Sequence, residues 1–168
     1  MEVIKRVEDK LMEVNKSLPQ IPENGRKLLA EWFWVIAIIG VVLGITGILA
    51  ILGIGVVGSA LLTGIGGGLL AASMWPTLLF GVLGMALAAI LELMAINPLK
   101  HRQYRGWQLM LAAVTLQVIF GILQAILTNT FSSIVGALLS FVIGAYLLAQ
   151  VHSYFVKNGQ AAHLNRKK

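Results

Sequence analysis

The stretch WFWVIAIIGVVLGITGILAIL, residues 32–52, decides the fold class of this chain. It holds no charged residue, and as a helix it would extend about 31 Å, which matches a hydrocarbon core of roughly 30 Å. It also begins a run of sixty uncharged residues between Glu31 and Glu92. A globular core does not use so long a run, so the sequence predicts a membrane-spanning helix here.

Composition places the whole chain in the same class. Hydrophobic residues make up 58% of the 168 residues, charged residues only 12%, and the mean hydropathy is +0.85, which leaves too little polar surface for a soluble domain. The residues before Trp32 carry six acids and six bases, which argues against a cleaved signal peptide. The chain has no cysteine, so disulfides, thiolate metal sites and cysteine nucleophiles are excluded.

Three further apolar stretches predict spans at residues 78–96, 107–127 and 134–150, and Asn97-Pro98 ends the first of these. Residues 53–75 are also apolar enough to cross, but they are rich in glycine, which weakens a helix by about 1 kcal/mol per residue relative to alanine. The glycines are Gly53, Gly55, Gly58, Gly64, Gly66, Gly67 and Gly68. The number of spans is five if this segment crosses the membrane and four if it does not.

The distribution of basic residues favours four spans. Six of the thirteen bases precede residue 28, three lie between residues 100 and 105, and four lie from residue 157 onward. Four crossings place all thirteen on one side, whereas five crossings divide them six against seven. Because cytoplasmic loops collect Lys and Arg, we expect both termini and the basic loop on the cytoplasmic side of the membrane. Residues 53–75 would then form a short helical hairpin on the outer side, re-entrant or interfacial.

The predicted fold is all-α, an integral membrane bundle of four transmembrane helices with a glycine-rich re-entrant or interfacial segment and an N-terminal amphipathic helix. We divide the chain into a cytoplasmic amphipathic helix and proline hinge (1–22), a transmembrane bundle (23–155) and a basic cytoplasmic tail (156–168). The amphipathic helix lies on the membrane surface in one interpretation and mediates self-association or partner binding in another. Its apolar seam consists of Ile4, Val7, Leu11, Val14 and Leu18.

Polar side chains within the spans are the first candidates for function. Glu92 is the only acid in a span, and we expect it near the cytoplasmic interface, where it reaches water or pairs with Lys100 or Arg102. A proton- or cation-handling role is the alternative for such a carboxylate. Side-chain amides in lipid seek hydrogen-bond partners, so interhelical contacts or a polar solute path are expected. The residues concerned are Thr115, Gln117, Gln124, Gln150 and Glu92.

Two other residue sets predict contacts rather than chemistry. Small residues at a spacing of four allow close helix packing, within a bundle or an oligomer. They are Gly40, Gly44, Gly84, Ala88, Gly136, Ser140 and Gly144. The loop after the second span combines bases with aromatic residues, which suits anionic lipid headgroups at the bilayer surface. Those residues are Lys100, Arg102, Tyr104, Arg105 and Trp107.

No motif indicates catalysis or a cofactor. The glycine run 64–68 lacks the Lys-Ser/Thr pair of a phosphate-binding loop. The histidines, His101, His152 and His163, share no metal-ligand spacing, and no Ser/His/Asp set or carboxylate pair can be assembled. The bases flank the spans instead of forming a basic domain, so we expect no nucleic-acid partner. We predict no cofactor, no metal and no enzymatic activity.

Three short motifs carry a resemblance. They are the stretch LPQIP at residues 18–22, Arg105-Gly106-Trp107, and AYLLAQV at residues 145–151. With them the chain resembles small multi-pass inner-membrane proteins of ultra-small bacteria. The resemblance implies a bacterial inner membrane, assigns no activity and transfers no site residue.

The sequence is compatible with two functional classes. A non-enzymatic scaffold or accessory subunit, acting through helix packing and its cytoplasmic tail, requires nothing that the sequence lacks. The alternative is a small-solute or ion transporter or channel formed by oligomerisation, in which the Gln117 and Gln124 face lines a path. The expected partners are the lipid bilayer with its anionic headgroups, further copies of the chain, or another membrane protein.

Overall fold

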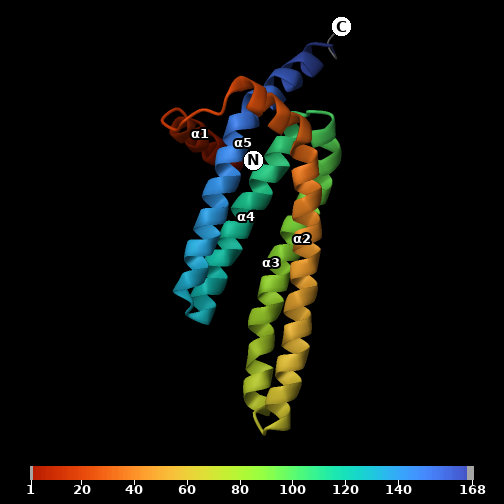
Figure 1. Ribbon diagram of the computed structural model, residues 1–168, viewed down its shortest axis with the longest axis vertical. Coiled ribbons are helices and arrows are strands. Elements are labelled where there is room, and N and C mark those ends of the chain that lie inside the picture. Colours follow the sequence, from red (N-terminus) through yellow and green to blue (C-terminus); the bar gives the residue numbers. More distant parts are fainter. Residues whose placement is uncertain (1, 166–168) are drawn as a thin grey trace.

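The computed structural model describes residues 2–165, with side chains described for residues 6–130 and 134–156. Within this range the chain is helical and contains no strand, which confirms the predicted all-α class (Figure 1). The helices are α1 (Glu2–Asn15), α2 (Glu23–Gly64), α3 (Gly68–Lys100), α4 (Tyr104–Thr128) and α5 (Phe131–Asn165). Four stretches are long and apolar enough to cross a membrane: Glu23–Gly64, Gly68–Lys100, Tyr104–Thr128 and Ile134–Val156.

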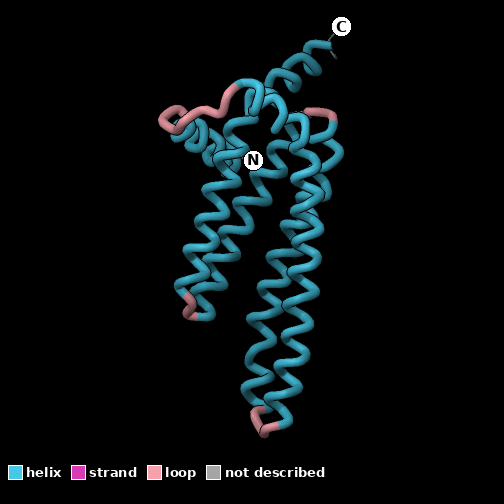
Figure 2. The backbone as a smooth tube through the Cα atoms, in the orientation of Figure 1, coloured by secondary structure: helices cyan, strands magenta, loops and turns pink. Residues whose placement is uncertain are grey.

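Short turns organise the four long helices into two antiparallel hairpins, α2–α3 and α4–α5 (Figure 2). The first turn contains Gly66 with a φ of 85°, a left-handed conformation that favours glycine. The second contains Asn129 with a φ of 53°, which asparagine tolerates. The hairpins pack together along α3 and α4. The helix α1, the α3–α4 loop and the last part of α5 lie at one end of the bundle, which we call the basic end (Figure 1).

Residues 53–75 form a helical hairpin, as predicted, but it is continuous with the two long helices and is not a separate segment. They continue α2 to Gly64 and begin α3 at Gly68, so the α2–α3 hairpin extends beyond the turn of α4–α5 (Figures 1 and 2). At 42 residues, α2 extends about 63 Å. The glycines lower helix propensity, but they do not end either helix. One of them, Gly55, also allows close packing, since a Cβ there would lie 2.8 Å from Leu78 Cδ1.

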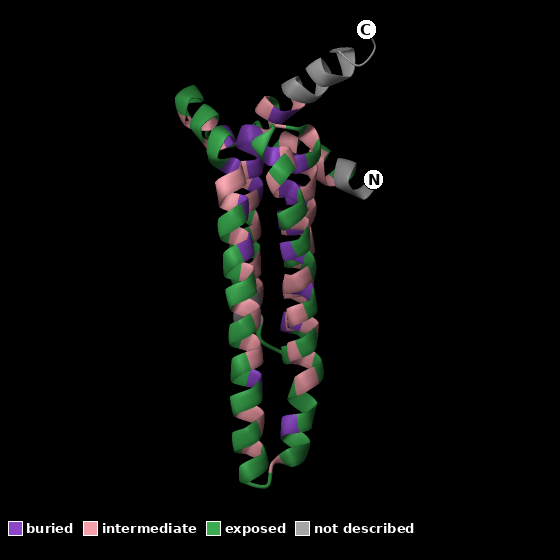
Figure 3. Cartoon of the chain, turned by 90° about the vertical axis from the view of Figure 1, so that its right-hand side faces the viewer, coloured by how far each residue is buried: buried purple, intermediate pink, exposed green. Residues whose placement is uncertain are grey.

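The buried core lies near the basic end. Aromatic rings and small side chains of all four long helices meet there, and Phe33 of α2 contacts Phe155 of α5 with ring centroids 6.3 Å apart. The other core residues are Ala30, Ala37, Ala95, Leu99, Trp107, Met110, Leu111, Leu148 and Val151. Away from this end the outward faces are largely exposed and apolar, as expected for contact with lipid chains (Figure 3).

The predicted amphipathic helix is present as α1, and it packs on α4 and α5. Val7 and Leu11 lie against the core, whereas Val14 is 55% exposed and Leu18 is 38% exposed. The side chain of Ile4 lies outside the described residues. The seam is therefore used in part for packing within the protein. At the other terminus, the backbone of α5 stays helical to Asn165, so the predicted tail begins as helix, and its side chains from residue 157 are outside the described range.

Candidate functional site

The two hairpins enclose a groove of about 600 Å³ below the core. Its walls come from all four long helices, and most of the lining is aliphatic, aromatic or glycine. Polar groups are contributed by Glu92, Gln117, Gln124 and Ser140. Volumes of 300 to 1,000 Å³ with apolar walls and a few polar groups are typical of small-molecule sites. The apolar lining includes Leu43, Ile51, Met85, Val114, Val118, Phe120, Ala137 and Phe141.

Glu92 lies in this groove with only 6% of its surface exposed. Its Oε1 accepts a hydrogen bond of 3.1 Å from Nε2 of Gln117 on α4. On the other side, the carboxylate packs against Gly40 of α2, where a Cβ would lie 2.7 Å from Oε2. The glycine at position 40 therefore makes room for the carboxylate, a use that helix-packing patterns alone did not indicate.

The predicted pairing of Glu92 with loop bases is wrong. Arg102 instead forms an ion pair of 3.0 Å with Glu31, and Nζ of Lys100 lies 5.8 Å from the ring centroid of Trp34. Eight residues of helix separate Glu92 from Lys100, which places the carboxylate about 12 Å below the loop. The side chain instead turns into the bundle, towards Gln117 of α4.

Only some of the polar residues predicted to form contacts or a solute path lie in the groove. Gln117 and Gln124 both line the groove, as their spacing on one helix face predicted. Gln124 packs against Gly81 of α3, where a Cβ would lie 2.8 Å from its amide atoms. Thr115 is not a groove residue, because its hydroxyl donates to the Leu111 carbonyl oxygen of its own helix at 2.8 Å. The hydroxyl group of a serine or threonine in a helix commonly finds its hydrogen-bond acceptor in this way.

Most of the small residues predicted for helix packing lie at close contacts between helices, and two do not. Gly44 contacts Ala89, and Gly144 contacts Val114, with Cβ distances of 3.7 and 3.3 Å. A Cβ at Gly84 would lie 2.5 Å from Phe120, and Ala88 is 1% exposed, so both residues lie at close contacts within the bundle. Gly136 makes no such contact within the chain, because nothing lies within 4 Å of a Cβ built there, and a contact with a second copy stays a prediction for it. Ser140 is exposed and lines the groove instead of packing against a neighbouring helix.

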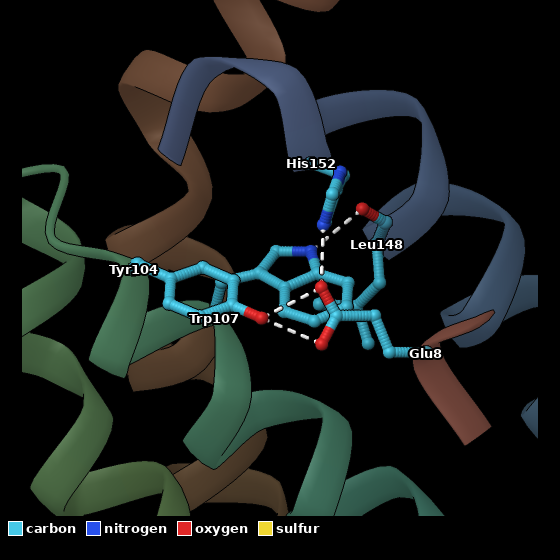
Figure 4. Close-up of polar contacts among 5 residues, drawn as sticks. All are labelled: Glu8, Tyr104, Trp107, Leu148 and His152. Carbon is cyan, nitrogen blue, oxygen red and sulfur yellow. Dashed lines mark hydrogen bonds and ion pairs between the residues drawn. The ribbon is translucent and has the colours of Figure 1, made fainter. Parts of the chain in front are cut away.

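A second polar cluster lies at the basic end and fastens α1 to the bundle (Figure 4). The carboxylate of Glu8 accepts hydrogen bonds of 2.6 and 2.5 Å from the Tyr104 hydroxyl and lies 2.8 Å from Nε2 of His152. Beside it, Nε1 of Trp107 donates to the Leu148 carbonyl oxygen at 2.8 Å. Sequence reasoning missed Glu8.

The headgroup set is corrected in part by this cluster. Trp107 is fully buried, so its predicted contact with lipid headgroups is wrong. Tyr104 is directed to Glu8, and Arg102 is committed to Glu31. Lys100 and Arg105 remain exposed, and headgroup binding stays a prediction for them.

Gln150 belongs to neither the groove nor a solute path. It is 2% exposed and its Nε2 donates to Oδ1 of Asn15 at 3.0 Å, while its Oε1 accepts from the Ile21 backbone N–H at 3.2 Å. The Tyr146 hydroxyl donates to the Pro19 carbonyl oxygen at 2.8 Å. The proline hinge is therefore fastened to α5. Glu8 and Asn15 are seven residues apart and flank the apolar seam, which is the sequence signal for this docking.

Replacing Glu8 with alanine is expected to release α1. The change leaves the Tyr104 hydroxyl and the His152 ring without their shared partner, and an unsatisfied buried polar group costs about 1 to 3 kcal/mol. Amide hydrogen exchange in α1 should then accelerate about tenfold or more, because 1.4 kcal/mol corresponds to a factor of ten. Glu13→Ala, at an exposed position on the same helix, is the matched control. Equal exchange in both variants would contradict a docking role for Glu8.

The groove thus combines a buried carboxylate, two amides and apolar walls within the membrane-spanning part of the chain. Glycines at positions 40 and 81 provide the space for its polar side chains. The cluster around Glu8 lies apart from it, at the basic end, and has a structural role. Comparisons of the chain with protein-family models, curated proteins and solved structures found no match.

Proposed function

We propose that this membrane protein binds a small solute in the groove between its hairpins and is a small-solute transporter or channel. The observation that carries the proposal is the position of Glu92, a buried carboxylate inside an apolar groove of ligand-sized volume. Ionisable groups within membrane spans are costly and commonly mark solute or ion pathways. Binding and passage of a solute require no catalytic group.

The core at the basic end limits what one copy can do alone. Phe33 and Phe155 pack together there as part of the buried core, and neither residue lines the groove. A continuous path across the bilayer therefore requires more than the groove of a single chain. We place that path in a homo-oligomer, in which further copies complete the wall.

Filling the groove tests this proposal. Ser140→Phe places a ring in the groove, whereas Leu139→Phe adds the same ring at a neighbouring position that is 59% exposed and outside the lining. Binding is measured with purified protein in detergent, as energy transfer from tryptophan to the probe. We expect diphenylhexatriene or its trimethylammonium derivative to bind saturably. Ser140→Phe should weaken that binding at least tenfold and Leu139→Phe should not. Absence of saturable binding of either probe would refute a solute site.

A scaffold or accessory subunit is the second candidate. The observation in its favour is the exposed tip of the α2–α3 hairpin, where Leu61 is 68% exposed and Leu69 is 91% exposed beyond the α4–α5 turn. Such apolar surface can contact lipid, a second copy or another membrane protein. In that role, filling the groove with Ser140→Phe would leave the cellular phenotype unchanged.

The proposed location is a bacterial inner membrane with both termini and the α3–α4 loop in the cytoplasm. This rests on the distribution of the bases and on the resemblance to proteins of ultra-small bacteria. Because the chain has no cysteine, a single introduced cysteine is the only thiol that a reagent can label. Ser73 and Gln103 are both exposed and suit this substitution. A membrane-impermeant maleimide added to intact cells should label Ser73→Cys and not Gln103→Cys. The reverse labelling pattern would overturn this orientation.

A further inference from the structure

The groove carries a single formal charge among its lining residues, the carboxylate of Glu92. Its Oε1 has one hydrogen-bond donor, Gln117, and its Oε2 faces the backbone of Gly40. A carboxylate can accept about four hydrogen bonds, so most of its capacity is unused by the side chains that the structure describes. A carboxyl group buried in this way is either protonated or has its negative charge compensated by a positive charge.

No base of the described part of the chain supplies that charge. Arg102 forms an ion pair with Glu31, and the His152 ring lies 2.8 Å from the Glu8 carboxylate, both at the basic end. Lys100 lies over the ring of Trp34. The positive charge can therefore come from a ligand that enters the groove, where the low dielectric strengthens its attraction to the carboxylate.

From these contacts we infer that the groove binds an amphiphilic organic cation, an amine or quaternary ammonium with an apolar body. The inference rests on the proposed function and names its class of solute. The charged head would lie at Glu92 beside the Gln117 amide oxygen. The apolar body would extend along the α4 wall towards Phe120 and Gln124, with Phe141 of α5 on the other side.

Other ligand classes fit the groove less well. A metal ion requires several oxygen ligands around one point, and Ca²⁺ takes six to eight. Gln117 and Gln124 are two helical turns apart, about 10 Å along α4, so they cannot join Glu92 around a single ion. A phospholipid headgroup would bring its phosphate to a carboxylate in a groove with no basic lining residue. An organic cation meets neither obstacle.

The charge of the ligand can be tested with two probes that share one body. Diphenylhexatriene is neutral, and its trimethylammonium derivative carries one positive charge on the same rod. With purified full-length protein in detergent, the cationic probe should bind at least tenfold more tightly than the neutral probe. Glu92→Gln keeps the size of the side chain and its ability to accept from Gln117, and it should bring the two affinities within about twofold. Elution volume and circular dichroism check that this variant is folded.

A second pair of variants tests the position of the carboxylate without changing its charge. Gly40→Ala places a Cβ 2.7 Å from Oε2 of Glu92, so the carboxylate must move. We expect it to weaken binding of the cationic probe by about fivefold or more and binding of the neutral probe by clearly less. Gly53→Ala, in the same helix with nothing within 4 Å, is the control and should change neither.

The outcomes separate this inference from the proposed function. Equal affinities for the two probes, both lowered by Ser140→Phe and insensitive to Glu92→Gln, would keep the groove as a solute site and overturn its preference for cations. Saturable binding of neither probe would overturn both. Discrimination between the probes that Glu92→Gln abolishes and Gly40→Ala reduces would establish the cation site.

Discussion

Trp107→Ala is expected to lower the free energy of unfolding by about 3 to 5 kcal/mol, the range measured for removing large buried aromatic side chains. Trp107 has no exposed surface and is the largest fully buried side chain of the core. Its ring stacks on Tyr104 with centroids 5.9 Å apart and meets the edge of His152 at 4.7 Å. The change therefore opens a cavity where α1, α4 and α5 meet, and it removes the donor to the Leu148 carbonyl oxygen.

The loss in free energy of unfolding is measured by titrating the purified protein with SDS and monitoring unfolding by circular dichroism. Trp107→Phe separates its two causes, because it keeps most of the apolar volume and loses only the hydrogen bond, which is worth about 1 kcal/mol. Trp32→Ala is the control, since Trp32 is 56% exposed. If Trp107→Ala were no more damaging than Trp32→Ala, the core would not be at the basic end.

Gly106→Ala is expected to destabilise the protein by about 3 kcal/mol, the upper range for overpacking a core. The sign is unusual, because alanine normally stabilises a helix interior by about 1 kcal/mol relative to glycine. At this position a Cβ would lie 2.7 Å from the backbone nitrogen of Leu99 and 2.9 Å from the carbonyl carbon of Pro98. Backbone atoms at the end of α3 cannot move aside as a flexible side chain can.

The matched control is Gly58→Ala in α2, where nothing lies within 4 Å of the added Cβ. That change should be neutral or slightly stabilising in the same SDS titration, because helix propensity is the only term left. Opposite signs for the two substitutions would show that contact between the start of α4 and the end of α3, and not glycine flexibility, explains Gly106. A stabilising effect of Gly106→Ala would refute this close approach.

The spans were predictable because hydropathy and charge act locally. Four membrane helices followed from apolar length, and the choice of four over five followed from where the bases lie, without knowledge of any contact. The glycine-rich segment 53–75 was interpreted by a rule for helices in water, in which glycine costs stability. Packing of α2 against α3 offsets that cost, so both helices continue through the segment.

Only those parts of the candidate site that depend on spacing along a single helix could be predicted. Gln117 and Gln124 share a face by their spacing, and both line the groove. The surroundings of Glu92 depend on α2 and α4, which are distant in sequence, so Gly40 and Gln117 could not be assigned to it. For the same reason Trp107 was placed at the lipid surface, although the docking of α5 buries it.

The membrane class and the four spans could be read from the amino-acid sequence, because they depend on each segment's own transfer between water and lipid. Which polar side chains meet depends on how the helices pack. The groove exists because α2 and α5 touch through Phe33 and Phe155 near the basic end and the two hairpins leave a ligand-sized space below it. The packing of side chains between helices sets that geometry, and hydropathy along the chain carries no information about it.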